Sequence, residues 1–493
     1  MMEEGLRFGA RWWLAPGLAF ALHVGCGDSA TTDDATTGDE TSSTAEGGGG
    51  TSTGSLACPA VADGGEAAPS SGTGQVAWVE EIPVLRGVSA AGSPQGGVVV
   101  AGTGVSDGSA LSLGPHEVYD GTENLSLAAV ARMDEEGTFA WAQGIIPTSA
   151  DVTWSPPLTV AGTAQGALVA MAIDRAVTVG TTTYNETGAS TLLLLHIGSE
   201  GVIWSATFGA AVPTDFVMRA NAAGRTAFAL RYDAAVDLGG GARDCTNVVL
   251  AVDADGGRQF DRCAAVGEEF PLVEGIDITD DGDVVLSAFP PAEYDVGLGP
   301  MSIDSSRGAS VLFRMDGLTG ATEWATVFSG AYAQHPTVDP MGRIHVAGNV
   351  PGLVPDVALG RAPLGECAVD PGFAHHVTQL SPEGDWVRST FVGDRGPMSA
   401  TADGRLYIVP GGVDAFAPGL PSMSRQRVVA FDADGAIAWQ QTFPEDSVQL
   451  RVSMVDGGDR PFVLMGLNGT LSLEGGESVT GEGFAPFIAS LTP

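Results

Sequence analysis

The chain has 493 residues, of which 60 are acidic and 22 are basic, so its formal net charge is −38. A surface of this sign repels polyphosphate and anionic membranes, so neither nucleic acid nor a bare membrane surface is an expected partner. All the basic residues are arginines, which excludes a Schiff-base lysine and a P-loop lysine. The 70 glycines and 29 prolines, in a composition that is 44% hydrophobic, indicate a large core in a chain that turns often.

Residues 1–25 have the pattern of a signal peptide. Arg7 and Arg11 precede an apolar run, residues 12–24, that is too short to span a bilayer. The run ends in "LHVGC", which resembles a bacterial lipobox, and this resemblance implies that Cys26 is lipidated. His23 stands where that pattern prefers Leu, so plain secretion or a periplasmic location is the alternative.

Residues 26–73 follow as a segment rich in Gly, Ser, Thr and Asp, with few apolar residues. Such a segment buries too little surface to fold, so we expect a disordered tether. It contains "GTSTG" (50–54), a formal match to the hydrolase nucleophile elbow. That motif requires a strand before it and a helix after it, and the tether offers neither, so we interpret the match as chance.

From residue 74 onward the chain repeats a hairpin signature. In "FDADGAIAWQQTF" (431–443), an apolar run, an Asp/Gly turn and a second run with an aromatic residue follow one another, as in a tight β-hairpin. The gaps between successive aromatic residues run from 53 to 64 residues, and such a period without a helical pattern indicates a repeated β unit. We expect these aromatic residues to pack between neighbouring units. They are Trp78, Trp141, Trp204, Phe260, Trp324, Trp386 and Trp439.

A second hairpin alternates with the first, for example at 88–104, 275–290 and 453–469. Two hairpins supply four antiparallel strands, the content of one propeller blade. Residues 74–82 look like the second half of an aromatic hairpin and residues 486–493 like the first half, and pairing them removes two open edges. The sequence therefore predicts an all-β domain over 74–493, a seven-bladed β-propeller. Its closing blade takes three strands from the C-terminus and one from the N-terminus.

Units such as "VDPMGRIHVAGN" and "FDADGAIAWQQTF" resemble the β-propeller repeat family of exported and lipid-anchored bacterial surface proteins. The resemblance covers nearly all of the predicted domain and consists of structural motifs. It implies a location outside the cytoplasm, at the outer membrane or the cell surface. It implies no particular activity, because propellers carry many functions.

The remaining cysteines are Cys58, Cys245, Cys263 and Cys367. Cys245 and Cys263 flank the turn "DADGG" almost symmetrically, so we expect them to face each other across a hairpin within disulfide reach. An exported protein permits that bond. Cys58 and Cys367 would then remain to pair with each other. No C-x-x-C spacing is present, so zinc is not expected.

Neither a cofactor nor a metal is predicted. We interpret turn residues such as Asp432 and Asp434 as caps of tight turns, and "DITDDGD" (277–283) is the best remaining calcium candidate. His335 and His345 lie ten residues apart across a predicted turn and would be able to meet. The adjacent residues His375 and His376 face opposite sides of a strand.

The short turns are expected on one face of the ring and the long links, such as 106–126, 297–309 and 359–372, on the other. Binding residues usually lie on loops of a rigid scaffold, so the long-link face is where we expect a site. The alternative is a variable surface that binds nothing.

No catalytic constellation is recognisable, so the prediction is a monomeric, non-enzymatic binding or scaffold module for an envelope protein or a polysaccharide. Two alternatives remain open. A glycan-active lyase or hydrolase requires convergent acid and base groups. A quinone-cofactor propeller also has repeats like "AFDADGAIAWQQTF", but this chain lacks the adjacent Cys pair and the lysines that the resemblance would imply.

Overall fold

The computed structural model describes residues 75–492, except 84, 150, 152, 186–189, 265–272, 304–308, 351–357, 360, 361, 364–373, 393–395, 402, 410–425, 445, 446 and 473–477. Contacts divide the chain into two units, Met1–Gly54 and Ser55–Pro493, and every described residue belongs to the second. The predicted leader and tether lie outside the described residues, together with Cys26, Cys58 and Cys367. Within the described ranges, no helix is long and apolar enough to cross a membrane.

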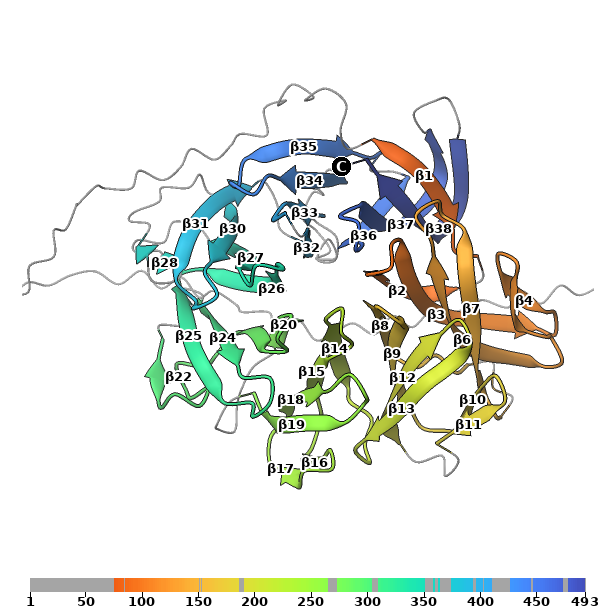
Figure 1. Ribbon diagram of the computed structural model, residues 1–493, viewed down its shortest axis with the longest axis horizontal. Helices are drawn as coiled ribbons and strands as arrows, with labels where there is room; N and C mark the ends of the chain where they lie inside the picture. Colours follow the sequence, from red (N-terminus) through yellow and green to blue (C-terminus); the bar gives the residue numbers. More distant parts are fainter. Residues whose placement is uncertain are drawn as a thin grey trace, which may run out of the picture. The chain divides into compact units, whose positions relative to one another are not determined.

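The strands form seven antiparallel blades around a common centre (Figure 1). Blade 1 contains β2 (Arg86–Gly92), β3 (Val98–Asp107), β6 (Asn124–Met133) and β7 (Phe139–Pro147). Blade 2 contains β8 (Leu158–Thr163), β9 (Gly166–Ile173), β12 (Thr191–Gly198) and β13 (Gly201–Phe208). Blade 3 contains β14 (Asp215–Ala220), β15 (Thr226–Arg231), β18 (Asn247–Val252) and β19 (Arg258–Cys263).

The next three blades repeat this order from the centre outward. Blade 4 contains β20 (Val273–Ile278), β21 (Val284–Ala288), β24 (Ala309–Met315) and β25 (Thr322–Ser329). Blade 5 contains β26 (Tyr332–Val338), β27 (Ile344–Val350), β30 (Ala374–Leu380) and β31 (Trp386–Val392). Blade 6 contains β32 (Met398–Ala400), β33 (Leu406–Ile408), β34 (Arg427–Phe431) and β35 (Ile437–Thr442).

Blade 7 closes the ring with strands from both ends of the chain. It contains β36 (Val448–Val455), β37 (Pro461–Ser472) and β38 (Ser478–Leu491), and β1 (Val76–Glu81) is its outer strand. Trp78 lies opposite Ser490, and the Thr492 N–H donates to the Gln75 carbonyl at 2.8 Å. The seven-bladed propeller with a shared closing blade is therefore confirmed.

The middle strands of a blade are covered on both faces by neighbouring blades, and their sequences reflect this. Every residue of β9 and β12 is buried, and both strands are runs of apolar residues rather than alternating ones. The outer strand β13 is partly exposed and alternates. The core is thus a series of layers between blades; one layer joins Val99 and Val130 of blade 1 to Val169 and Leu193 of blade 2.

The short turns of the hairpins lie together on one face of the ring, here called the turn face. Each inner hairpin of the seven blades begins its turn with a buried polar residue whose side chain or backbone binds within that turn. The Asp283 N–H, for example, donates to Thr279 Oγ1 at 2.9 Å, and the Arg405 N–H donates to Thr401 Oγ1 at the same distance. These capping residues are Ser93, Thr163, Asn221, Thr279, Asp339, Thr401 and Asp456.

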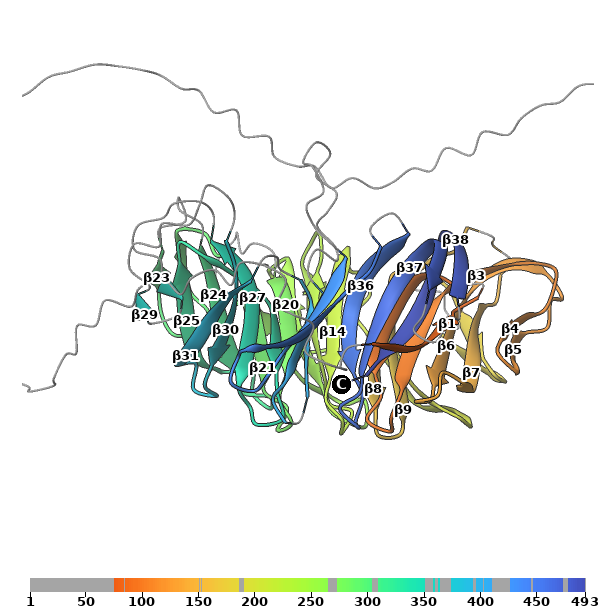
Figure 2. The same ribbon diagram turned by 90° about the horizontal axis from the view of Figure 1, so that it is seen from above.

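The connections between the second and third strands lie on the opposite face, here called the link face, which Figure 2 shows edge-on. The sequence predicted variable links. Among the described residues, five of these links contain a small hairpin. Two of the hairpins extend the outer strand of the preceding blade, because β10 pairs with β7 and β28 pairs with β25. The pairs are β4 (Leu111–Leu113) with β5 (His116–Tyr119), β10 (Val177–Val179) with β11 (Thr182–Tyr184), β16 (Val236–Asp237) with β17 (Ala242–Arg243), β22 (Glu293–Tyr294) with β23 (Met301–Ser302), and β28 (Ala358–Leu359) with β29 (Ala362–Pro363).

Candidate functional site

The turn face is occupied by contacts that hold the blades to one another. At the seam between blades 7 and 1, the Gly97 N–H donates to Asp456 Oδ2 at 2.8 Å, and the Gly457 N–H donates to the Ser93 carbonyl at 2.9 Å. At the seam between blades 3 and 4, Asn221 Nδ2 donates to the Thr279 carbonyl at 3.0 Å. Buried polar groups that already have partners have little capacity left for a ligand, so this face is structural.

The repeated aromatic residues also hold the blades together, as predicted. Trp78 Nε1 donates to the Glu135 carbonyl at 2.8 Å, and Trp204 Nε1 donates to the Ala254 carbonyl at 2.8 Å, in each case in the outer turn of the next blade. A Cβ added to Gly384, which has φ +80°, would lie 2.7 Å from the Trp324 ring. The rings of Trp78, Trp204 and Trp324 are therefore covered by the outer turn of the next blade.

Blade 5 departs from the sequence prediction. In the other blades the aromatic residue follows a register shift near the outer turn, but in blade 5 the corresponding position, opposite Gln379, is held by Arg388 and not by Trp386. The Arg388 guanidinium takes over both roles of the ring. It lies 2.9 Å from the position of a Cβ on Gly435, and Nη2 donates to the Ala433 carbonyl at 2.5 Å.

A cavity of about 530 Å³ opens on the link face at the seam between blades 7 and 1. Its walls come from the connection between β1 and β2, from the end of β3, from the beginning of β36 and from the β37–β38 hairpin. This volume lies within the usual range of small-molecule sites. The lining residues are Glu81, Ile82, Leu85, Arg86, Gly87, Val105, Arg451, Glu482, Gly483, Ala485 and Pro486.

Arg451 enters this cavity from an irregular point in the innermost strand of blade 7. Leu450 pairs with Met465 and Val452 pairs with Leu464, so Arg451 is an extra residue without a partner in the ladder. Such a β-bulge turns a side chain away from its regular direction. Arg451 is half-buried, and desolvation by burial lowers the pKa of its guanidinium below the ordinary value.

The opposite wall has a second irregularity in the innermost strand of blade 1. Arg86 pairs with Thr103 and Ser89 pairs with Ala101, so the register shifts between them. Arg86 is exposed at this shift. Two adjacent inner strands thus break their regular pairing beside the same cavity and supply one arginine each.

The histidines suggested by the sequence do not form a site. His345 lies opposite Thr337, not His335, because the register of β26 shifts between Gln334 and Thr337. His345 is fully buried, and its Nε2 lies 3.1 Å from Asp339 Oδ2, the cap of its own turn.

The neighbouring pair is divided between two environments. His376 is fully buried, and burial lowers its pKa to about 4, whereas His375 is only half-buried. The structure therefore does not unite these rings as metal ligands.

The carboxylates of the calcium candidate point to different partners. Asp277 Oδ2 accepts the Val338 N–H at 2.6 Å, which joins blades 4 and 5. Asp283 binds Arg314 through Oδ2 and accepts the Gly317 N–H at 2.8 Å through Oδ1. In the described part of the chain, no three His, Cys, Asp or Glu side chains are arranged to hold a metal ion.

The turn residues behave as predicted from their chemistry. Asp253 Oδ1 accepts the N–H groups of Asp255 and Gly257 at 3.0 and 2.7 Å. Asp434 Oδ1 accepts the Ala436 N–H at 3.1 Å, and the backbone of Asp432 closes the same turn with Ala436. The side chains of Asp253 and Asp434 therefore hold the backbone of their own turns.

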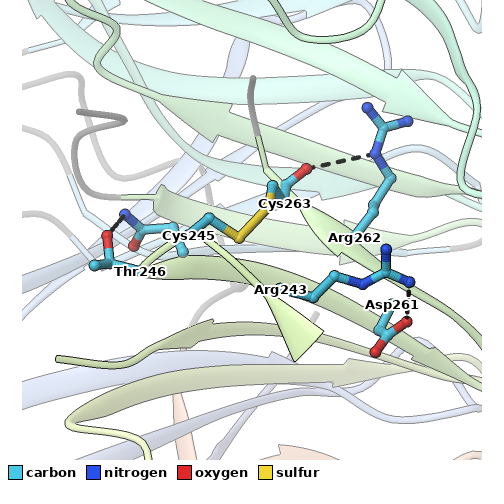
Figure 3. The surroundings of a disulfide bond; sticks show 7 residues. Arg243, Cys245, Thr246, Asp261, Arg262 and Cys263 are labelled. Atoms are coloured by element: carbon cyan, nitrogen blue, oxygen red, sulfur yellow. Dashed lines mark hydrogen bonds and ion pairs between the residues drawn. A yellow bond between two sulfur atoms is a disulfide. The ribbon is translucent and has the colours of Figure 1, made fainter. Parts of the chain in front are cut away.

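Cys245 and Cys263 form a disulfide with a Cα–Cα distance of 5.9 Å (Figure 3). The expected geometry was wrong, because Cys263 lies opposite Val248 in the ladder and Cys245 precedes β18. The bond therefore connects the end of the blade 3 link to the outer strand β19. Asp261 on the same strand is buried and binds Arg243 at 2.7 Å.

Sequence reasoning missed the cavity and both of its arginines. The β-bulge at Arg451 depends on how β36 pairs with β37, which the local sequence does not encode. A charged residue inside "VQLRVSM" (448–454), an otherwise largely apolar inner strand, is the one signal that would have drawn attention to it.

No protein-family model matches the chain, and no curated protein matches it in sequence. Similar solved structures include the Dos1 propeller, with 10% identity, a TM-score of 0.42 and coverage of 85% of this chain and 95% of that one. BamB from Moraxella catarrhalis has 11% identity, a TM-score of 0.35 and coverage of 85% and 97%, respectively. A gluconolactonase from Xanthomonas campestris has 11% identity, a TM-score of 0.33 and coverage of 70% and 97%. The strand pairing of the chain itself defines it as a seven-bladed β-propeller.

Proposed function

We propose that the chain is an exported, lipid-anchored propeller that acts as a monomeric, non-catalytic binding or scaffold module in the cell envelope. Its ligand is an envelope protein or a polysaccharide, and its binding site lies on the link face. The leader that ends at Cys26 supports the anchor, and the Cys245–Cys263 disulfide is compatible with an oxidising compartment.

The cavity at the seam between blades 7 and 1 is the observation that carries this proposal. It combines arginine and glutamate side chains with apolar walls, and it lies where the two chain ends close the ring. On the turn face, the capping residues are already engaged within and between blades. The link face is therefore the surface that has both space and polar groups available for a ligand.

The test uses the full chain, produced with its leader in a bacterial host, next to a Cys26→Ala variant. The wild-type chain is expected in the membrane fraction and to require detergent for release, and the variant is expected in the aqueous fraction. Equal partitioning of the two would overturn the anchor.

The detergent-solubilised chain is then screened by thermal unfolding with purified envelope polysaccharides and envelope proteins. A ligand at a hundred times its dissociation constant adds about 2.7 kcal/mol, which raises the melting temperature by a few degrees. Release of new reducing ends or unsaturated sugars during the incubation would show catalysis and contradict the non-enzymatic role. Silence across both panels would contradict the binding role.

A further inference from the structure

Arg451 differs from the other half-buried arginines that the structure describes. Each of the others has an interaction partner: Arg314 pairs with Asp283, Arg343 pairs with Asp339 at 2.6 Å, and the remainder bind carboxylates, backbone carbonyls or other groups. Arg451 has no hydrogen bond or ion pair with any described residue, although the chain has 60 acidic residues against 22 arginines.

This lack of a partner has an energetic cost that a ligand would relieve. A guanidinium stays protonated at neutral pH, so a half-buried one without a counter-charge has lost part of its hydration without compensation. The β-bulge holds Arg451 in that position, and the carboxylates that line the same cavity, Glu81 and Glu482, do not pair with it. A planar anion that accepts two parallel N–H bonds is the group that a guanidinium binds best.

The other residues that line the cavity restrict the charge of the anion and the kind of molecule that carries it. Glu81 and Glu482 repel a dianion or a polyphosphate, as does the net charge of −38, so a monoanion is favoured. The same carboxylates are acceptors for hydroxyl groups. Leu85, Val105 and Pro486 supply apolar surface, and Val105 is 49% exposed. A pyranose ring has hydroxyl donors at its edge and C–H groups on its faces, and so matches both kinds of wall.

We propose that this cavity binds a carboxylated sugar unit of a polysaccharide, with the carboxylate on Arg451, Arg86 at the mouth, and hydroxyl groups on Glu81 and Glu482. The inference rests on the proposed function and selects the polysaccharide as ligand. Peptide ligands are less well matched, because the two glutamates add acceptors where an extended peptide would need paired donors and acceptors from a strand edge.

The test measures binding to the full chain, by calorimetry, of oligosaccharides that carry one galacturonic acid or one glucuronic acid unit in an otherwise neutral sugar chain. Neutral galactose oligosaccharides, sulfated galactose oligosaccharides and a peptide with a free terminal carboxylate serve as comparisons. Arg451→Ala is expected to weaken uronate binding roughly tenfold to a hundredfold, as expected for loss of hydrogen bonds to a charged group. Arg231→Ala is the matched control, because Arg231 is exposed, its guanidinium has no hydrogen bond or ion pair with a described residue, and it lies outside this cavity.

A merely structural role for Arg451 would be revealed by the free energy of unfolding without ligand. Because Arg451 has no partner among the described residues, Arg451→Ala is expected to leave that free energy nearly unchanged while it weakens binding. A large loss of stability would overturn the assignment.

The comparison ligands separate the inference from the proposed function. Binding of a neutral polysaccharide or a protein, but not of uronates, would overturn the inference and leave the proposed function standing. Preference for the sulfated sugar or for the peptide would overturn the carboxylated sugar. Absence of binding to every ligand would contradict both.

Discussion

On the turn face every inner hairpin has a turn that begins with a buried polar capping residue. The connections on the link face, by contrast, differ in length and in strand pairing. The caps of the turn face are all buried and bind backbone groups of their own turn or of the next blade. On the link face, β10 extends blade 1 and β28 extends blade 4, but β16 and β17 pair only with each other. The repetition marks the groups that hold the ring together, and the variation marks the surface that is free to acquire a ligand.

The register shifts of the strands also divide into a repeated kind and a kind found in particular blades. Blades 1 to 6 each have a register shift in the outer hairpin just before its turn, as at Arg132/Met133 and Ala430/Phe431. Shifts between the first two strands occur in the described parts of β2, β20, β26 and β36 only. The first kind belongs to the repeat, and the second kind is particular to individual blades, as expected of a site and not of a scaffold.

Asp456 offers the strongest way to test the structural role of the turn face. Its carboxylate is buried and accepts the N–H groups of Gly97, Gly458 and Arg460 at 2.8, 2.9 and 2.9 Å. Asp456→Ala leaves these donors without acceptors and is expected to cost about 4 kcal/mol in the free energy of unfolding, measured by urea denaturation.

Asp456→Asn is the control for shape. It keeps an oxygen for the two donors of its own turn but presents an amide to Gly97, so its loss is expected to be about half as large. If Asp456→Ala lowered stability no more than Arg451→Ala, the contrast between the two faces would be wrong.

The disulfide gives the second largest expected effect, and it acts on the link face. Cys245 and Cys263 are 18 residues apart. Loss of a cross-link that closes a loop of this size is expected to lower the free energy of unfolding by about 3 kcal/mol. The double variant C245A/C263A is compared with the wild-type chain by thermal unfolding with and without a reductant. The reductant should lower the melting temperature of the wild-type chain and leave that of the variant unchanged. A wild-type chain insensitive to reductant would contradict a stabilising bond.

The blade count and the closure were predictable because the hairpin turns are local. Asp and Gly in turns such as 432–435 act through bonds to neighbouring backbone groups, so a short segment contains the whole signal. The pairing of β1 with β38 followed because two incomplete hairpins at the chain ends had no other partner.

The register of particular residues was not predictable in the same way. Three features depend on which residues of two strands face each other. They are the place of Arg388 where the repeat predicts Trp386, the offset of Cys245 from Cys263, and the extra residue at Arg451. Sequence alternation does not reveal a one-residue insertion in a ladder, because apolar residues lie on both sides of a strand that is covered on both faces.

The smallest expected effect is a change in the pH dependence of the free energy of unfolding when Asp277, which joins blades 4 and 5, is replaced. Burial raises the pKa of its carboxyl to about 6, although Arg219 and the N–H groups of Val338 and Ile278 act in the opposite direction. Between about pH 4 and pH 6 the folded chain therefore holds a proton that the unfolded chain has lost, so this group's contribution to stability is complete below that range and disappears as pH rises through it. Asp277→Asn cannot titrate, so the free energy of unfolding of the variant, relative to wild type, should rise by about 2 kcal/mol from pH 4 to pH 7. His376, whose pKa is about 4, acts in the opposite direction in both proteins, and the difference between the two curves cancels it. The free energy of unfolding of both proteins is measured by urea denaturation at each pH. If the two curves were parallel, the Asp277 carboxyl would be ionised over the whole pH range and its raised pKa would be wrong.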